Sequence, residues 1–192
     1  MPPKANGVIT RETELPGVLI VEPVRFADSR GVFFESWNMR RYAASGIPEK
    51  FVQDNVSQSA RGVLRGLHFQ NPEAQGKLVS VLCGEVYDVV VDIRRGSPTF
   101  GQWTAVTLDA ESGKQLYVPE GFAHGFCVTS DSAVFTYKCT VFYAPDCEHT
   151  IRWDDPEINI SWPVGDPLLA DKDRDARCLK DLPRDLLPAY NG

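Results

Sequence analysis

The stretch Val86-Tyr-Asp-Val-Val-Val-Asp-Ile93 decides the class of fold, because its side chains alternate in character with a period of two. One face would carry Tyr87, Val89, Val91 and Ile93, and the other would carry Asp88 and Asp92. A period of two is typical of a β-strand. A second stretch, Ser132 to Tyr143, repeats the pattern with one face made of Ala133, Phe135, Tyr137, Cys139, Val141 and Tyr143.

Turn-forming residues interrupt the chain at short intervals around these strands. They occur at Gly96-Ser-Pro98, Glu111-Ser-Gly113, Pro119-Glu-Gly121 and Ser130-Asp-Ser132. Many short strands joined by such turns are typical of a double-sheet jelly roll or barrel. We therefore predict a mainly β fold, a cupin-like double-sheet jelly roll with a few short peripheral helices.

The N-terminal part predicts two further strands and one helix. Strands are expected over Val18–Val24 and Val32–Trp37, separated by turn residues at Asp28–Gly31. A short helix is expected over Met39–Ser45, with Asn38 as its N-cap and Gly46 ending it.

The length of 192 residues and the absence of a linker or repeat predict one domain over residues 1–192. Residues 1 to about 16 lack periodicity and are expected to form an arm or an edge strand. Residues from about 164 to 192 are rich in Asp, Lys, Arg and Pro, and are expected to form a tail that packs on the outside.

The composition of the chain limits the classes of binding partner and the cellular compartment that we expect. The formal net charge is −6 and the sequence pI is about 5.1, so we do not expect a nucleic-acid partner. No signal-peptide pattern or long apolar run is present, so no membrane contact is expected. The five cysteines are odd in number and scattered, which is typical of free thiols in a reducing compartment, and cytoplasm is the expected location.

Only three histidines are available for chemistry: His68, His124 and His149. The sequence lacks GxGxxG, GxxxxGK[ST], HExxH and GxSxG motifs. It also lacks the His-x-His pair with which jelly-roll metalloenzymes hold a metal, so no metal is expected. A lone histidine on a half-apolar strand is either a hydrogen-bonded structural residue or a general base, and the sequence leaves both readings open.

Several motifs follow one another in the order of a known family. They are Gly62-Val-Leu-Arg-Gly-Leu-His-Phe-Gln70, Gln75-Gly-Lys77, Gly84–Arg94, Ser97-Pro-Thr-Phe-Gly-Gln-Trp103, Val118–Phe126 and Asp171-Lys-Asp173, with Arg30-Gly31, Glu35 and Gln53-Asp-Asn55 upstream. Together they resemble the dTDP-4-dehydrorhamnose 3,5-epimerase family over roughly residues 8 to 175. The resemblance implies a cupin-type jelly roll, a homodimer, no cofactor and a dTDP-linked 4-keto sugar as substrate.

The chemistry that the resemblance implies needs three kinds of group. A ketone at carbon 4 acidifies the hydrogens on carbons 3 and 5, so a base removes a proton from one face and an acid returns one to the other. The enolate oxygen formed in between needs a cation or a donor. By resemblance His68 is the base, Tyr137 the acid, Lys77 the enolate partner, and Asp173 holds His68, with Asp171 as the competitor for that role.

The resemblance also suggests substrate-binding residues. Arg65 and Arg30 would pair with the diphosphate, where the bidentate geometry of arginine suits phosphate oxygens. The other matched positions are Glu35, Gln53, Asp54, Asn55, Lys77, His124, Glu148 and Lys172. Some nucleotide contacts in this family come from the neighbouring subunit, so Arg30 and Glu35 are expected to act across the dimer. Each role has a plain structural alternative. Arg30 and Arg65 could form surface ion pairs, Tyr137 could be an ordinary core tyrosine, and Asp171 and Asp173 could be solvated loop charges.

One detail conflicts with regular alternation. Strict alternation puts Arg65 and His68 on opposite faces of one strand, and a bulge or twist at Gly66 would reconcile them.

The sequence thus predicts an epimerase that acts at carbons 3 and 5. A mono-epimerase or ketoisomerase on a related nucleotide-linked sugar is the alternative within the fold. A metal-dependent jelly-roll enzyme and a non-catalytic sugar-nucleotide binder are the rivals outside it.

Overall fold

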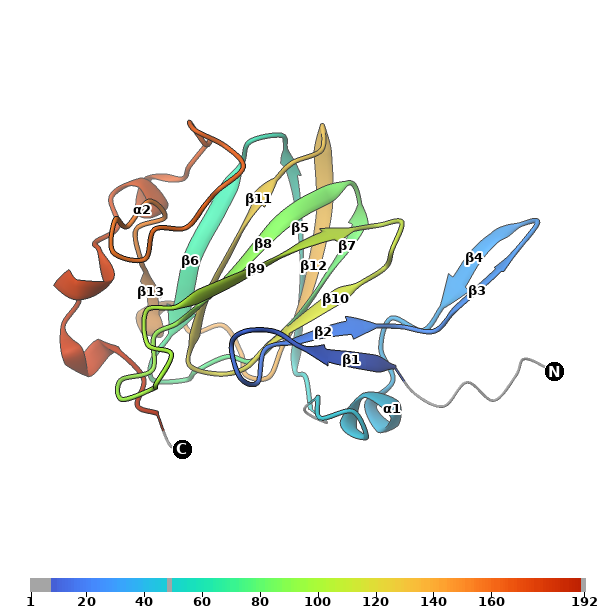
Figure 1. Ribbon diagram of the computed structural model, residues 1–192, viewed down its shortest axis with the longest axis horizontal. Coiled ribbons are helices and arrows are strands. Elements are labelled where there is room, and N and C mark those ends of the chain that lie inside the picture. The colour runs from blue at the N-terminus through green and yellow to red at the C-terminus, as the bar shows by residue number, and fades with distance from the viewer. Residues whose placement is uncertain (1–7, 48–49, 191–192) are drawn as a thin grey trace.

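Two antiparallel sheets pack face to face in the computed structural model, which describes residues 8–47 and 50–190 (Figure 1). The six-stranded sheet has the order β1 (Ile9–Glu12), β2 (Leu19–Glu22), β10 (Gln115–Val118), β7 (Lys77–Cys83), β12 (Ser132–Cys139) and β5 (Gln53–Ala60). The five-stranded sheet has the order β13 (Glu148–Thr150), β6 (Leu64–Gln70), β11 (Phe122–Val128), β8 (Glu85–Asp92) and β9 (Trp103–Asp109). The prediction of a mainly β, double-sheet jelly roll is confirmed.

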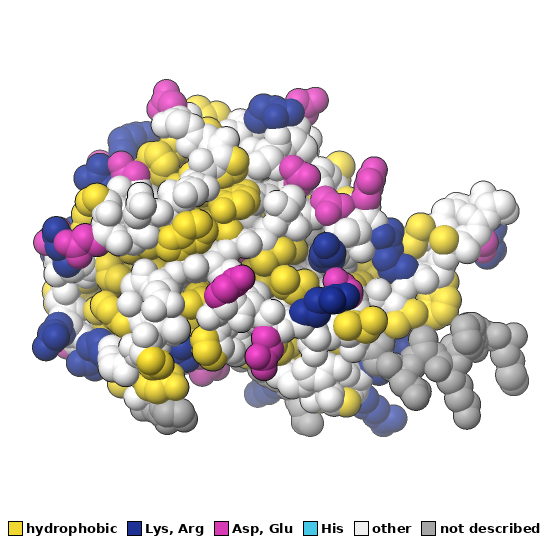
Figure 2. Space-filling view, viewed as in Figure 1, with side chains coloured by type: hydrophobic (Ala, Val, Ile, Leu, Met, Phe, Trp, Pro, Cys, Tyr) yellow, Lys and Arg dark blue, Asp and Glu magenta, His cyan; other side chains and the backbone are white. Residues whose placement is uncertain are grey.

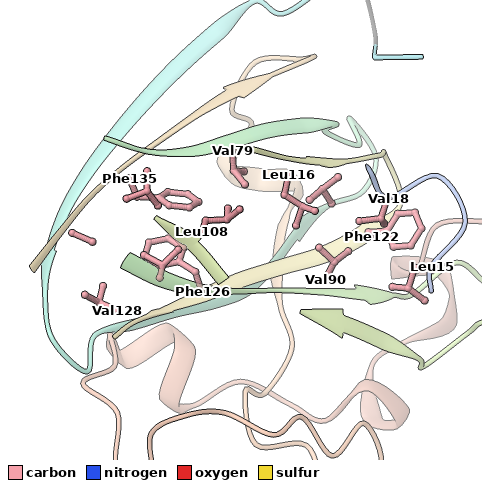
Figure 3. Close-up of a cluster of buried hydrophobic side chains, with 14 residues drawn as sticks. Leu15, Val18, Val79, Val90, Leu108, Leu116, Phe122, Phe126, Val128 and Phe135 are labelled. Carbon is pink, nitrogen blue, oxygen red and sulfur yellow. The ribbon is translucent and has the colours of Figure 1, made fainter. Parts of the chain in front are cut away.

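The space between the sheets is filled by apolar side chains from both of them (Figure 3). Phe126 of β11 and Phe135 of β12 stack with ring centroids 4.1 Å apart, and so join the two sheets. On β8, Val86 and Val90 belong to this central cluster, whereas Val89 packs on the outer side of the sheet. The alternation along β8 therefore separates two buried faces.

The predicted strand over Ser132–Tyr143 is too long, because β12 ends at Cys139. Cys139 pairs with Gln53, the first residue of β5, and with Lys77, the first residue of β7. Beyond Cys139 the chain therefore has no strand on either side with which to continue a ladder.

The predicted N-terminal strands and helix form but are shorter, and the strand over Arg25–Asp28 was not predicted. Helix α1 (Met39–Ala43) begins after Asn38, whose side chain accepts a hydrogen bond from the backbone N–H of Arg41. Strands β3 (Arg25–Asp28) and β4 (Gly31–Phe34) form a two-stranded hairpin with its turn at the predicted place. The hairpin projects from the body of the molecule (Figure 1).

The C-terminal segment covers the outer face of the five-stranded sheet. It contains helix α2 (Asp171–Arg174) and 3₁₀ turns at Leu179–Asp181 and Arg184–Leu186; another 3₁₀ turn lies at Pro145–Cys147. Leu179 and Leu187 are buried against Val89, Val91 and Ile151. The predicted peripheral tail thus supplies an outer apolar layer.

The expected N-terminal arm is described only from residue 8 onward, since residues 1–7 lie outside the described part of the chain. Within it, Ile9–Glu12 forms β1, which pairs with β2 at the edge of the six-stranded sheet. The edge-strand alternative for this segment is therefore the one observed.

Figure 2 shows hydrophobic side chains gathered over the middle of the face on which β8 and β9 lie in Figure 1, with charged side chains mostly around the rim.

Helices α1 and α2 have five and four residues, and neither is long enough to span a membrane. The same holds for every helix of residues 8–47 and 50–190.

Candidate active site

A cavity of about 350 Å³ lies between the sheets, beside β5, an edge strand, and β6, the neighbour of the edge strand β13. The five-stranded sheet contributes polar side chains to one wall: Arg65, His68, Gln70, His124 and Glu148. The six-stranded sheet contributes the opposite wall: Gln53, Asn55, Ser57, Lys77 and Tyr137. Ten of the residues expected at the site, including Lys172 and Asp173, line this cavity.

A bulge in β6 brings Arg65 and His68 to the same cavity. His124 of β11 pairs with His68, but Phe126, two residues further, pairs with Arg65, three residues away on β6. The extra residue on β6 shifts the alternation by one position. Gly66 lies in this bulge with φ of +133°, and a Cβ there would lie 2.5 Å from the Cα of Gly125. The bulge expected at Gly66 is thus present, and it requires glycine.

His68 is held by an aspartate from the C-terminal segment. Its Nε2 lies 2.6 Å from Oδ1 of Asp173, a residue with only 1% of its surface exposed. With Nε2–H donated to the carboxylate, the neutral ring carries its lone pair on Nδ1. Asp171, the competitor for this role, is exposed and pairs with Arg174 at 2.7 Å. Asp173 and not Asp171 is therefore the partner of His68.

A second histidine–aspartate pair lies directly beside the first. His124 pairs with His68 across the strands, and its Nε2 lies 2.9 Å and 3.0 Å from the two carboxylate oxygens of Asp88. Both residues are buried, and burial raises the pKa of Asp88, while His124 and Lys77 oppose the rise. Sequence reasoning missed Asp88, although a carboxylate inside a valine-rich strand is a signal, since a buried charge needs a partner.

Tyr137 and Lys77 face the two histidines from the other sheet. Burial is the main cause that raises the pKa of the Tyr137 phenol, and the charges of Cys139 and Glu148 add to it. Burial lowers the pKa of Lys77, with partial compensation from acidic neighbours. The phenol therefore stays protonated over a wide pH range, and the lysine gives up its proton more readily than an exposed one.

Further charged and polar groups line the same cavity. The guanidinium of Arg65 donates to Oγ of Ser59 at 3.2 Å and 3.1 Å, which fixes its orientation. Glu148 accepts hydrogen bonds from Lys172 at 2.8 Å and from the Tyr143 hydroxyl at 3.1 Å. Burial raises the pKa of Glu148, but the bond from Lys172 and nearby positive charge outweigh it and leave the pKa lowered.

Asp54 was expected at the site, but the structure places it on the outer face of β5. Alternate side chains of a strand point to opposite faces, so Asp54 points away from the cavity when Gln53 and Asn55 point into it. On the outer face its carboxylate lies 3.0 Å from Nζ of Lys138. Gln53 and Asn55 therefore line the cavity and the residue between them does not.

Arg30 and Glu35 also lie away from this chain's own cavity. The Arg30 side chain is 88% exposed at the turn of the β3–β4 hairpin, where it pairs with Asp28 at 2.6 Å. Glu35 follows the hairpin and pairs with Arg41. Arg30 belongs to the hairpin that projects from the body (Figure 1), and neither Arg30 nor Glu35 lines the cavity.

The described residues contain no group of three or more His, Cys, Asp or Glu side chains arranged to hold a metal ion. His68 and His124 each use one ring nitrogen on a carboxylate instead. The arrangement suits proton transfer: one wall offers an imidazole backed by a buried carboxylate, and the other offers a phenol and an amine.

Comparisons with known proteins agree with this arrangement. A dTDP-4-dehydrorhamnose 3,5-epimerase from Pseudomonas aeruginosa is 56% identical over 169 residues, which cover 87% of this chain and 93% of that protein. A dTDP-4-dehydrorhamnose 3-epimerase from Streptomyces niveus is 45% identical over 184 residues, covering 94% of this chain and 88% of that protein.

Solved structures show the same fold. The crystal structure of dTDP-6-deoxy-D-glucose-3,5-epimerase from Legionella pneumophila, in complex with dTDP-4-keto-L-rhamnose, superposes with a TM-score of 0.94 at 49% identity. The aligned region covers 96% of this chain and 100% of the Legionella pneumophila chain. The family model of dTDP-4-dehydrorhamnose 3,5-epimerase matches residues 12–181. The chain therefore belongs to the dTDP-4-dehydrorhamnose 3,5-epimerase family.

Proposed function

We propose that this chain inverts carbons 3 and 5 of dTDP-4-keto-6-deoxy-D-glucose and so forms dTDP-4-keto-L-rhamnose. One observation carries the proposal: His68 and Tyr137 line one cavity from opposite sheets of the sandwich. A pyranose ring bound between the sheets would present one face to each, and inversion requires a base on one face and an acid on the other.

The base in this mechanism is Nδ1 of His68. It takes the proton from carbon 5, and in a second cycle from carbon 3, and the C–H electron pair moves into the enolate. The buried carboxylate of Asp173 keeps the proton on Nε2 and stabilises the imidazolium that forms. Asp173 is thus a positioning residue, because it acts through His68.

The enolate oxygen lies on carbon 4, between the two acidic carbons. Lys77 and His124 reach the cavity from different sheets, and Lys77 presents the N–H donors of its ammonium group to it. Donors fixed in advance stabilise a developing negative charge more than mobile water does, because they need not reorganise during the reaction. We assign Lys77 to this oxygen and His124 to the same region of the sugar.

The acid at carbon 5 is the hydroxyl of Tyr137. At carbon 5 it donates its proton to the face opposite His68, which leaves a tyrosinate and a protonated imidazole. At carbon 3 a water molecule gives the proton to that face, and the hydroxide formed is neutralised by the proton that His68 releases. Solvent then returns a proton to the tyrosinate and removes one from His68, so the cycle consumes no cofactor. The raised pKa of Tyr137 keeps the phenol protonated before the transfer.

The nucleotide half of the substrate is assigned to the further polar groups of the cavity. Arg65, oriented by Ser59, suits diphosphate oxygens. Gln53 and Asn55, joined by a 3.0 Å hydrogen bond, and the pair Glu148–Lys172 suit the ribose and the base.

We further propose a homodimer in which the β3–β4 hairpin of one subunit completes the site of the other. The hairpin projects from the body and exposes Val32 and Phe33 by 49% and 68% (Figure 1). Apolar side chains so exposed on a projecting element favour a protein partner. Arg30 at the turn and Glu35 beyond it would then reach the partner's nucleotide.

We also propose that the whole chain forms one domain and that the protein is located in the cytoplasm. The five cysteines are free, as is usual in a reducing compartment.

Proton NMR of the purified protein with dTDP-4-keto-6-deoxyglucose in deuterated water tests the function. Deuterium at carbons 3 and 5, with the signals of the L-lyxo product, is the expected result. Deuterium at one carbon only would replace the proposal by a mono-epimerase, the activity named for the Streptomyces niveus relative. Absence of exchange at either carbon would overturn it.

A further inference from the structure

Ser57 carries a polar atom that the protein itself does not satisfy. It lies on β5 and lines the cavity, and its Oγ is buried in the cavity wall. Among the described residues, no other buried side-chain oxygen or nitrogen lacks a hydrogen-bond partner. A buried hydroxyl without a partner costs stability, and such positions in a native protein are often functional.

The neighbours of Ser57 indicate which part of a ligand it meets. Across the sheet it pairs with Phe135, whose ring stacks on that of Phe126 at 4.1 Å (Figure 3). All three residues line the cavity. A diphosphate needs cationic donors and is poorly solvated against phenyl rings. A pyranose ring suits this place, since it offers apolar C–H groups to the aromatic rings and hydroxyls to a neutral donor–acceptor.

The adjacent inward positions of β5 already have partners. Asn55, two residues before Ser57, bonds to Gln53 and pairs across the sheet with Tyr137. Ser59, two residues after it, accepts from the Arg65 guanidinium. Ser57 therefore lies between the residue beside the proposed acid and the residue that holds the proposed phosphate-binding arginine.

We propose that Oγ of Ser57 hydrogen-bonds to a hydroxyl group of the sugar ring and so positions the ring between the two sheets. Rotation about the Cα–Cβ bond of Ser57 turns Oγ from the wall toward the cavity without moving the backbone. The inference takes its class of ligand, a nucleotide-linked hexose, from the proposed function. It does not depend on turnover, so it is tested by binding alone.

The test compares the affinities of dTDP-glucose and dTDP in Ser57→Ala by calorimetry. Loss of one hydrogen bond to the sugar is expected to weaken dTDP-glucose binding by about tenfold and to leave dTDP binding unchanged. Ser59→Ala serves as the contrast, because loosening Arg65 should weaken both ligands. Equal weakening of both ligands in Ser57→Ala, or no change in either, would overturn the proposal.

A thermal melt of the ligand-free variant separates this role from a structural one. Removal of a hydroxyl that has no partner should leave the melting temperature of Ser57→Ala unchanged or raise it. A lower melting temperature would mean that the hydroxyl supports the fold, and would contradict the proposal. If the wild-type protein bound dTDP-glucose but exchanged no protons with the keto sugar, the proposed function would fail while this inference could still hold.

Discussion

Asp173 and His68, separated by 105 positions in the sequence, are joined by a 2.6 Å contact between Oδ1 and Nε2. The C-terminal segment makes this contact possible, because its apolar residues fasten it over the five-stranded sheet and carry α2 to the cavity. The outer layer of the fold therefore contributes to the site as well as to stability.

Asp173→Asn should disable the base while leaving the site intact. An asparagine amide can donate to Nε2 and hold the wrong tautomer, so kcat should fall by about 10²- to 10³-fold with dTDP affinity unchanged. Asp171→Asn is the matched control in the same helix, since Asp171 is exposed and bonded only to Arg174. Steady-state kinetics of both variants decide this, and equal effects would contradict the assignment.

The pH dependence of kcat should show an alkaline limb from Lys77. Its pKa is lowered by burial, so the ammonium form is lost at a lower pH than in an ordinary lysine, and activity falls as pH rises through that pKa. Tyr137 has a raised pKa and titrates later. The Lys77→Gln variant should be about 10²-fold slower and should lack this limb. A limb retained in that variant would show that another group causes it.

Complementation between two inactive variants tests the proposed exchange of hairpins. Arg30→Ala removes the hairpin cation and His68→Ala removes the base, so each homodimer should be nearly inactive. In a mixed dimer one of the two sites regains both groups, and co-expression at equal amounts should restore about a quarter of the wild-type rate. Activity no greater than the sum of the separate variants would mean that Arg30 does not act across subunits.

Gly66 should be the least replaceable glycine of β6 and its flanks. In Gly66→Ala the new Cβ would meet backbone atoms of Gly125, and the variant should lose about 3 kcal/mol or more, measured by urea unfolding. Gly62→Ala is the control, because Gly62 also has positive φ but open space around its Cβ position, so about 1 kcal/mol is expected. Similar losses in both variants would show that the bulge tolerates a side chain.

Local sequence patterns predicted the strands of this fold better than their ends. The alternation along β8 and β12 was sufficient to identify both strands, but β12 stops at Cys139 because its two neighbours begin opposite that residue. The ends depend on pairing between segments far apart in the chain, and local patterns do not contain that information.

The site was predictable where a motif or an alternation defined it, and less so where tertiary contacts did. The conflict between Arg65 and His68 pointed to a bulge at Gly66, and the register contains one. Asp54 was grouped with its two neighbours although alternation turns it outward, where it meets Lys138. Asp88 was missed because its partner, His124, comes from another strand.

The central claim is that base and acid act from opposite sheets, and Tyr137→Phe tests it most directly. Deuterium incorporation by this variant should be followed by NMR in deuterated water, beside His68→Ala. The account predicts exchange at neither carbon in His68→Ala. In Tyr137→Phe it predicts that inversion at carbon 5 is lost while exchange at carbon 3 continues. Formation of the L-lyxo product by Tyr137→Phe at the wild-type rate would contradict it.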